Sequence, residues 1–201
     1  MKQGERQMAT SLGKVDTSHR ARYSLASKYI KAEDVILDFG CGTGYGSYFM
    51  ASQRPDITVV AVDCDPEAVK FAINYFNHRR VTYELVRKEL DQAASYDIIT
   101  MFEVIEHVKN PLTILKNLYE CLREGGALFL STPDQRVMPY DPKRFPFHVR
   151  HFKQKEFEDL IKQAGFILER KFTQLSKRSP KITGGWGGAF NIALCRKLQK
   201  S

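Results

Sequence analysis

The chain has 201 residues, a length typical of one domain with a large buried core. Hydrophobic residues make up 43% and charged residues 27%, a composition that indicates neither a disordered chain nor a disulfide scaffold. The N-terminus lacks the apolar stretch of a signal peptide, and no window approaches the roughly 20 apolar residues of a membrane span. We therefore expect a cytoplasmic protein without membrane insertion. The net charge of +8 admits nucleic acid, acidic lipid or a phosphorylated compound as a partner.

The cysteines predict neither a metal motif nor a redox motif. They are Cys41, Cys64, Cys121 and Cys195, and no two of them form a C-x-x-C pair. A zinc knuckle or a dithiol redox site needs such close spacing. We therefore expect free thiols.

Residues 1–17 are polar and lack a periodic pattern, so we expect a flexible N-terminal arm before a single domain at residues 18–201. Apolar residues keep helical spacing from Ser18 to Ile30, which predicts an amphipathic helix that covers one side of the ligand site. The polar side chains near its start are His19, Arg20 and Tyr23. They face either the active site or the surface.

The next element is a short apolar run, Val35–Leu37, which predicts a strand buried on both faces of a parallel sheet. Asp38 ends the run, and glycines follow at every second position. These glycines are Gly40, Gly42, Gly44 and Gly46. Residues without Cβ allow a tight turn into the next helix, Tyr45–Gln53, and let a ligand lie on the backbone. The stretch therefore predicts a cofactor site.

The spacing of these glycines distinguishes two kinds of cofactor. A dinucleotide fingerprint, G-x-G-x-x-G, requires glycine where the chain has Tyr45 or Ser47. The pattern present is acidic-x-Gly-x-Gly-x-Gly over residues 38–44, which resembles motif I of the class I S-adenosylmethionine-dependent methyltransferases. That cofactor carries an ammonium and a sulfonium, for which the Asp38 carboxylate is a suitable neighbour. The alternative is a nucleotide-binding scaffold or an oxidoreductase of similar fold, which requires the NAD binding that the broken fingerprint disfavours.

A second acidic residue follows the glycine turn at a suitable distance. Thr58–Val62 predicts a strand, and Asp63 lies at its end, about 20 residues beyond the turn, where a carboxylate can accept from both ribose hydroxyls. Asp65 and Pro66 then begin a helix as N-cap and first helical residue. The residues expected to contact the cofactor are Asp38, Gly40, Cys41, Gly42, Gly44, Asp63, Cys64 and Glu103.

Strands and helices continue to alternate, which predicts a parallel, doubly wound α/β sheet. Ligands of such sheets bind beyond the C-terminal ends of the strands. The resemblance implies a Rossmann-like sheet of seven strands, mostly parallel, with an antiparallel last strand. In the resembling family an acidic residue after the third strand, predicted here at Val81–Val86, often meets the adenine amino group. The nearest positions in this chain are Arg87 and Lys88, which do not supply an acidic contact.

Tyr96–Phe102 predicts the fourth strand, and a group of metal-ligating residues follows it. Glu103, Glu106 and His107 have the spacing i, i+3 and i+4, which places them on one face if the segment is helical. Two carboxylates and an imidazole suit Mg²⁺ or Mn²⁺, and such a metal polarises an acceptor hydroxyl. The group resembles the E-x-x-E-H set of small-RNA 2′-O-methyltransferases and of ubiquinone O-methyltransferases. The resemblance adds His148 as a further ligand.

These residues also have roles that need no metal. The Glu106 carboxylate can stabilise the N-terminus of the helix that begins near Asn110. Without a metal, His107 or His148 is the candidate general base, because the unperturbed pKa of histidine is about 6.5.

The last third of the chain contains the predicted acceptor site. A helix, a Gly-Gly turn and a strand at Ala127–Ser131 precede Pro133–Phe152, whose prolines block regular structure and whose aromatic residues offer stacking surfaces. We expect this segment to bind the acceptor. Strands at Phe166–Phe172 and Phe190–Cys195 follow after a further helix, and a flexible linker at residues 179–188 joins them.

The resemblance implies a methyltransferase of the ubiquinone-biosynthesis O-methyltransferase type. Its acceptor is then a hydroxyl of a small molecule, a sugar or a lipid-linked intermediate. Holding that hydroxyl in a near-attack geometry supplies much of the rate of methyl transfer. The alternative is a metal-assisted RNA 2′-O-methyltransferase, which the basic segments Lys143–Lys155 and Arg170–Lys181 favour.

Overall fold

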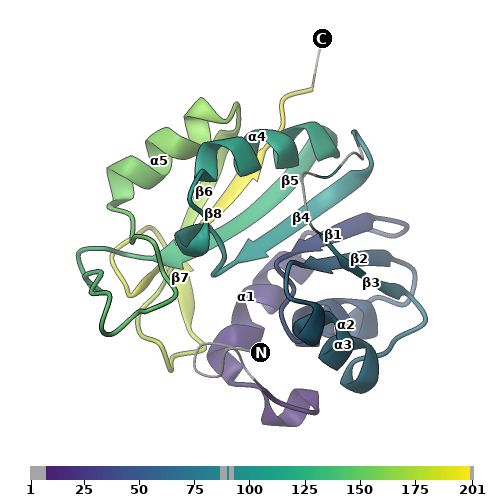
Figure 1. Cartoon of the computed structure of the whole chain (residues 1–201). Coiled ribbons are helices and arrows are strands. Elements are labelled where there is room, and N and C mark those ends of the chain that lie inside the picture. The colour runs from purple at the N-terminus through teal and green to yellow at the C-terminus, as the bar shows by residue number, and fades with distance from the viewer. Residues whose placement is uncertain (1–7, 87–89, 91–92, 200–201) are drawn as a thin grey trace.

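The structure is a computed structural model that describes residues 8–86, 90 and 93–199. Its strands form one sheet in the order β3-β2-β1-β4-β5-β8-β6-β7 (Figure 1). The strands are β1 (Val35–Phe39), β2 (Thr58–Asp63), β3 (Val81–Leu85), β4 (Tyr96–Phe102), β5 (Leu122–Pro133), β6 (Ile167–Gln174), β7 (Ile182–Gly184) and β8 (Phe190–Arg196). The helices are η1 (Leu12–Lys14), α1 (Thr17–Ser27), α2 (Tyr45–Gln53), α3 (Pro66–Tyr75), η2 (Ile105–His107), α4 (Pro111–Cys121) and α5 (Gln154–Gln163).

The sheet has the predicted doubly wound topology. β1 pairs in parallel with β2 and β4, β4 pairs in parallel with β5, and β8 runs antiparallel to β5. The expected class and the antiparallel last strand are therefore confirmed. The expected number of seven strands is wrong, because the described residues form eight. The additional strand, β7, lies inside the predicted flexible linker at residues 179–188, and its backbone pairs with the otherwise open edge of β6.

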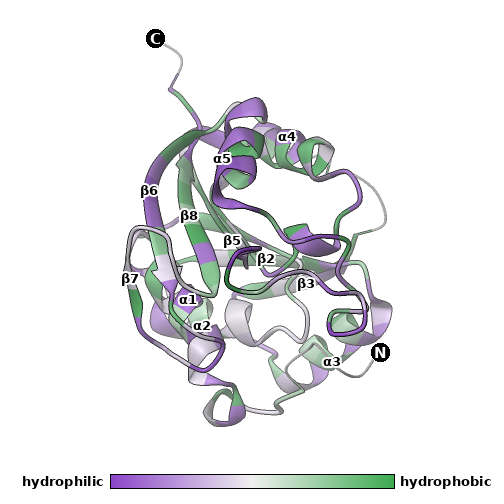
Figure 2. Ribbon diagram, turned by 90° about the vertical axis from the view of Figure 1, so that its left-hand side faces the viewer, coloured by the Kyte–Doolittle hydropathy of each residue, from purple (hydrophilic) through white to green (hydrophobic). Residues whose placement is uncertain are grey.

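Helices cover both faces of the sheet, with α1, α2 and α3 on one face and α4 and α5 on the other (Figure 1). Ile36 and Leu37, consecutive in β1, are both fully buried. Ile36 packs with side chains of α1 and α2, and Leu37 packs with those of α4 and α5. This double burial explains the continuous apolar run. Figure 2 shows the contrast between β8, which is mainly hydrophobic, and β6, near the sheet edge, which is mainly hydrophilic.

Capping side chains set the starts of two helices. The Asp16 carboxylate accepts a hydrogen bond from the Ser18 N–H at 2.8 Å, so α1 begins at Thr17 rather than at Ser18. α1 ends at Ser27, before the predicted end at Ile30. The predicted cap of α3 is confirmed, because Asp65 accepts from the N–H of Glu67 and a proline occupies the first turn. Among the described residues, no helix has the length and apolarity that a membrane crossing requires.

The described part of the N-terminal arm packs against the domain. Ala9 and Val15 are buried in a cluster with Phe76. Residues 1–7 lie outside the described residues, so the flexibility of the arm stays a prediction.

The junction between α4 and β5 lies earlier than predicted. α4 ends at Cys121, and β5 begins at Leu122 rather than at Ala127. The Lys197 ammonium donates to the carbonyls of Tyr119 and Leu122, at 2.8 Å each. These bonds satisfy carbonyls that a helix leaves unpaired at its end. A contact 75 residues away therefore helps to end this helix.

Candidate active site

The C-terminal ends of β1, β2 and β4 meet at one edge of the sheet. Asp38, Asp63 and Glu103 lie in or directly after these three strand ends, as predicted. The N–H groups of Gly40 and Cys41 both donate to the Val62 carbonyl, at 2.8 and 2.9 Å. The glycine turn after β1 is therefore tied to the end of β2.

Two glycines of the turn are needed for different reasons. Gly40 has φ +76°, and a Cβ there would lie 2.4 Å from Cγ2 of Val104. Gly42 has φ +55°, but a Cβ there would meet nothing within 4 Å. Packing thus excludes a side chain at Gly40, whereas Gly42 is a left-handed residue that borders open space. The second position has the room that a ligand lying on the backbone requires.

Asp38 is buried beneath this turn and is surrounded by hydroxyl groups. Its carboxylate accepts from Ser47 Oγ at 2.6 Å, Thr100 Oγ1 at 2.8 Å and the Tyr23 hydroxyl at 3.3 Å. Burial raises the pKa of Asp38 to about 6, although these hydrogen bonds act in the opposite direction. The predicted contact of Asp38 with the cofactor ammonium stays a prediction. In the structure, the Asp38 carboxylate also supports the glycine turn through these hydrogen bonds.

Asp63 connects the turn to the start of α3. Its Oδ2 accepts from the Gly42 N–H at 2.8 Å, and its Oδ1 accepts from the Asp65 N–H at 2.9 Å. The predicted contact of Asp63 with the ribose hydroxyls of a cofactor stays a prediction. Of the two predicted cysteine contacts, Cys41 is buried in the turn and Cys64 is exposed directly after Asp63. The expected adenine region at 87–88 lies outside the described residues.

Residues 103–107 do not form one helix, so the condition for placing Glu103, Glu106 and His107 on one face is not met. Glu103 has φ +56°, and η2 begins only at Ile105, as a short 3₁₀-helix. The Glu103 carboxylate accepts from Ser131 Oγ at 2.7 Å, and its N–H lies 3.2 Å from the same oxygen. These bonds join Glu103, at the end of β4, to Ser131 in β5. The left-handed backbone at Glu103 is not helical, so this residue cannot belong to the helical turn that follows.

The structure brings together three of the four predicted metal ligands. One donor atom each of Glu106, His107 and His148 lies within 4.8 Å of the others. Glu103 is not part of this group. Glu106 is fully buried, and neither of its oxygens has a hydrogen-bond partner among the described residues. Burial, with the nearby Glu103 carboxylate as second cause, holds the pKa of Glu106 well above its usual range.

The predicted acceptor segment folds back onto η2. The N–H of Val149 donates to the Glu106 carbonyl at 2.7 Å, and His107 Nδ1 lies 2.9 Å from the Phe147 carbonyl. Met138 and Phe145 of this segment pack with Phe190 at the start of β8. The segment has no helix or strand beyond Pro133, as predicted, but side-chain and backbone contacts hold it against the strand ends.

Hydrogen bonds define the tautomers of three histidines. A carbonyl only accepts, so His107 Nδ1 carries a proton toward Phe147, and His151 Nδ1 carries one toward Met138 at 2.5 Å. The unprotonated Nε2 of neutral His151 then accepts from His148 Nδ1 at 2.7 Å. His107 and His148 are therefore both left with an unprotonated Nε2.

Burial keeps the His148 imidazole neutral. It is the largest cause of the lowered pKa of His148, about 3, and the neighbouring imidazoles and Lys177 add to it. Burial also lowers the pKa of His151. His148 is thus a hydrogen-bond acceptor or a metal ligand at neutral pH, and a poor proton acceptor.

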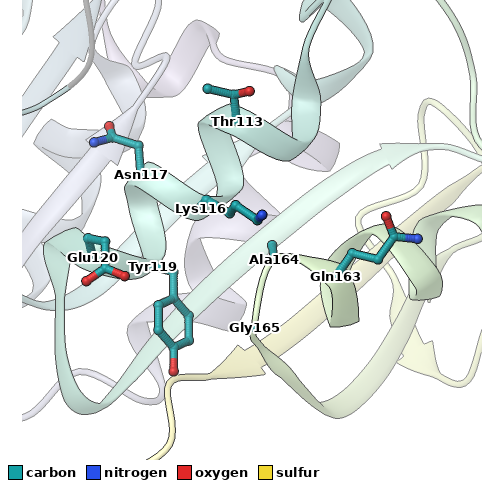
Figure 3. Close-up of a pocket in the computed structure, with 8 residues that line it drawn as sticks. All are labelled: Thr113, Lys116, Asn117, Tyr119, Glu120, Gln163, Ala164 and Gly165. Atoms are coloured by element: carbon teal, nitrogen blue, oxygen red, sulfur yellow. The ribbon is translucent and has the colours of Figure 1, made fainter.

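Two surface hollows lie near predicted elements. One of about 290 Å³ borders the acceptor segment and is lined by Gln135, Tyr140, Arg150, His151, Lys153 and Glu156. A larger one of about 560 Å³ lies between α4 and α5, where Figure 3 shows Lys116 and Tyr119 on α4 beside Ala164 after α5. Tyr119 precedes the start of β5, so this larger hollow lies at the opposite edge from the strand ends and contains no predicted site residue.

Several site residues were absent from the sequence prediction. Ser47 and Thr100 donate hydrogen bonds to the carboxylate of Asp38, and Ser131 donates one to that of Glu103. His151 accepts a hydrogen bond from His148. No local pattern marks the hydroxyl residues, because their partners lie in other elements. His151 had a signal, since it stands three residues after His148 in a segment already predicted to bind the acceptor.

Comparisons with known proteins agree with this geometry. Residues 12–171 match the family described as "Methyltransferase domain". A probable S-adenosylmethionine-dependent methyltransferase of Mycobacterium tuberculosis is 31% identical over 157 residues, covering 74% of this chain and 54% of that protein. The ubiquinone biosynthesis O-methyltransferase of Xanthomonas axonopodis pv. citri is 39% identical over 152 residues, covering 67% and 63%. The chain spans roughly half the length of the first curated relatives it matches.

Solved structures share the fold at low identity. A Thermotoga maritima methyltransferase, a possible histamine N-methyltransferase, aligns with a TM-score of 0.71 and 22% identity, covering 90% of this chain and 91% of that one. The [4+2]-cyclase SpnF aligns with a TM-score of 0.73 and 16% identity, covering 88% and 80%. A methyltransferase and a cyclase thus share this architecture, so the likeness shows the fold alone.

Proposed function

This chain belongs to the class I S-adenosylmethionine-dependent methyltransferases, and we propose that it methylates a hydroxyl oxygen of a small-molecule, sugar or lipid-linked acceptor. The observation that carries this proposal is the pair of unprotonated imidazole nitrogens, one on His107 and one on His148 within the segment Pro133–Phe152. Hydroxyl acceptors need a group that takes or orients their proton. The similarity to ubiquinone biosynthesis O-methyltransferases supports the same choice.

The residues around the glycine turn fit the cofactor. Gly42 borders open space, and the Asp63 carboxylate lies beside it at the end of β2, where a ribose diol would find an acceptor. Asp38 places a carboxyl group directly beneath the turn, where an ammonium group would favour its ionised form. When bound, S-adenosylmethionine supplies a methyl group on an activated sulfonium.

His107 and His148 have different parts in this proposal. His107 Nε2 accepts the proton of the acceptor hydroxyl, while its Nδ1–H stays bonded to the Phe147 carbonyl. His148 has a pKa of about 3 and stays neutral, so its Nε2 accepts a hydrogen bond and orients the hydroxyl. The acceptor segment positions the His107 ring through the Phe147 carbonyl and the His148 ring through the side chain of His151, and positioning supplies much of the rate.

A second candidate is metal-assisted 2′-O-methylation of RNA. Glu106, His107 and His148 would hold the ion, and a buried carboxylate without a hydrogen-bond partner suits that role. One carboxylate with two imidazoles matches Mn²⁺ better than Mg²⁺, which prefers oxygen ligands. The ion would polarise the acceptor hydroxyl. The net charge of +8 favours RNA as the acceptor.

One set of assays separates the two candidates. Methyl transfer to a panel of phenols, sugars and short RNAs is measured after dialysis against EDTA, and again after addition of Mg²⁺ or Mn²⁺. Full activity in EDTA, with loss in His107→Ala, supports the base, and recovery only with metal supports the second candidate. His78→Ala is the control, because His78 precedes β3 at the opposite edge of the sheet. If no member of the panel is methylated by the wild-type protein, O-methylation of these acceptor classes is wrong.

A further measurement addresses the acceptor class directly. RNA binding is followed by filter retention across a salt series, because phosphate contacts weaken steeply as salt rises. Retention of short RNAs near physiological salt would favour the RNA candidate. A cytoplasmic location stays a prediction.

A further inference from the structure

Two cations from distant parts of the chain meet at one aromatic ring of the acceptor segment. Lys177 lies in the connection between β6 and β7, and its Nζ is 4.6 Å from the centre of the Phe145 ring. The guanidinium carbon of Arg144 is 5.6 Å from the same centre. The two charges are therefore no more than about 10 Å apart, which is about one Debye length at 0.1 M salt, so they repel each other.

No carboxylate of the described residues neutralises this pair of charges. None of the ion pairs within the described part of the chain includes Lys177 or Arg144. The two acids of the acceptor segment have other partners, because Asp134 pairs with a neighbouring arginine and Asp141 accepts a backbone N–H. Residues 175–181, around Lys177, contain no acid. The pair is thus a local excess of positive charge.

The ring that joins the two cations also contacts the imidazoles of the acceptor segment. The centre of the Phe145 ring is 5.1 Å from that of His148 and 4.6 Å from that of His151. Phe145 is only 5% exposed, so packing fixes its position. Burial is the largest cause of the lowered pKa of both histidines, and the Lys177 charge adds to it. The cation therefore lies within electrostatic reach of the imidazole that is proposed to orient the acceptor hydroxyl.

This arrangement differs from that of other basic side chains on the surface. Lys155 pairs with Asp159, and Lys171 pairs with Glu158. A single exposed cation needs no such partner, because water solvates it. Two cations at one ring are less favourable, because their repulsion opposes the attraction of the ring for each of them. A bound anion would remove that repulsion and satisfy both groups.

We infer that Lys177 and Arg144 bind an anionic group of the acceptor, a carboxylate or a phosphate, while the acceptor hydroxyl lies at the histidines. This inference rests on the proposed acceptor site and narrows its substrate class to acidic compounds. A small acidic acceptor fits better than RNA, because the two cations converge on one point, whereas RNA carries its phosphates along a strand. Lys177 is then a specificity-determining residue that exchanges no proton in the reaction.

The test is calorimetric binding of matched acidic and neutral compounds to the protein saturated with S-adenosylhomocysteine. The pairs are 4-hydroxybenzoate with 4-hydroxybenzamide, and glucose 6-phosphate with glucose, so that a carboxylate and a phosphate are tested separately. The proteins are the wild type, Lys177→Gln and Lys177→Arg, which keeps the charge. Lys181→Gln is the matched control, because Lys181 is an exposed lysine of the same connection.

The wild type should bind at least one acidic compound about three- to tenfold more tightly than its neutral partner, the range for partly exposed charge pairs. Lys177→Gln should lose this preference, whereas Lys177→Arg and Lys181→Gln should keep it. Raising the salt from about 0.05 M to about 0.5 M should reduce the preference of the wild type, because salt screens exposed charges. Equal preferences in Lys177→Gln and the wild type, or no preference in the wild type, would overturn the inference.

If none of the four compounds binds, titration with inorganic phosphate decides. A shift of the His148 and His151 imidazole signals in ¹H–¹⁵N spectra that is absent in Lys177→Gln supports the inference, and unshifted signals overturn it. RNA binding that Lys177→Gln abolishes, without binding of any small acid, also overturns it. None of these measurements requires methyl transfer. An acidic preference in a protein that methylates no hydroxyl would remove the proposed reaction and leave the anion site in place.

Discussion

The titration of Asp38 is the sharpest test of the buried cofactor turn. Burial raises its pKa from 3.8 to about 6. A shift of about two units corresponds to about 3 kcal/mol. Because the folded pKa is raised, the native state binds this proton more tightly than the unfolded chain does. The contribution to stability is therefore fully present below about pH 4, and it is lost as pH rises through about 6.

The assay is urea unfolding of the wild-type protein and of Asp38→Asn between about pH 4 and pH 8. The free energy of unfolding of the wild type minus that of Asp38→Asn should fall by about 3 kcal/mol over this range, since other titrations cancel in the difference. Asp56→Asn is the control. Its side chain is 42% exposed beside Arg54, so this variant makes the same change of carboxylate to amide at the surface. A flat difference for Asp38→Asn would refute the reasoning.

Three further predictions concern the turn, the histidines and the acceptor segment. Asp63→Ala should weaken S-adenosylhomocysteine binding by about 10- to 100-fold in calorimetry, because the ribose diol and the Gly42 N–H both lose an acceptor; wild-type affinity would remove Asp63 from the site. His151→Leu should convert His148 to the Nε2–H tautomer in long-range ¹H–¹⁵N spectra, whereas His151→Gln, which keeps an acceptor, should not. An Nε2–H signal for His148 in the wild type would contradict the hydrogen-bond chain. Proteolysis within Pro133–Phe152 should slow when cofactor and acceptor are both bound, and unchanged cutting of that complex would argue against an acceptor role.

Elements with a strong local pattern were predictable from the sequence. The expected bounds of β4 and α2 agree with the structure at both ends. A strand buried on both faces has an unbroken apolar run, and a glycine turn marks the start of the helix that follows it. β7 has no such pattern, because none of its three residues is buried and the strand depends on pairing with β6.

The site was less predictable because distant residues define its geometry. The spacing of Glu103, Glu106 and His107 assumes a continuous helix, whereas the left-handed backbone at Glu103 is accompanied by bonds to Ser131, 28 residues later. The carboxylate at Asp38 was expected to meet the ligand directly. Its hydroxyl partners come from three different elements, so no local sequence pattern predicts that Asp38 is buried.

Unsatisfied polar groups concentrate at the same edge as the predicted site. In the described part of the chain, buried side-chain atoms without a hydrogen-bond partner occur in Arg20, Arg22, Glu106, Thr132, Arg150, Gln174 and Asn191. Because β8 runs antiparallel, its first residues lie beside the last residues of β5 and β6, and Asn191 is the register partner of Thr132. The Gln174 side chain also donates to the Ser18 carbonyl, which holds the start of α1 at this edge.

Native interiors satisfy nearly all of their buried polar groups. Random defects of packing would be scattered through the sheet, whereas six of these seven residues belong to α1, η2, β5, β6 and β8, and the seventh, Arg150, lies in the acceptor segment. An acid such as Glu106 and a cation such as Arg22 would stabilise the free protein if they were paired, yet they stay apart. Their separation lowers stability and leaves donors and acceptors available to a ligand, which is the compromise expected of a binding site.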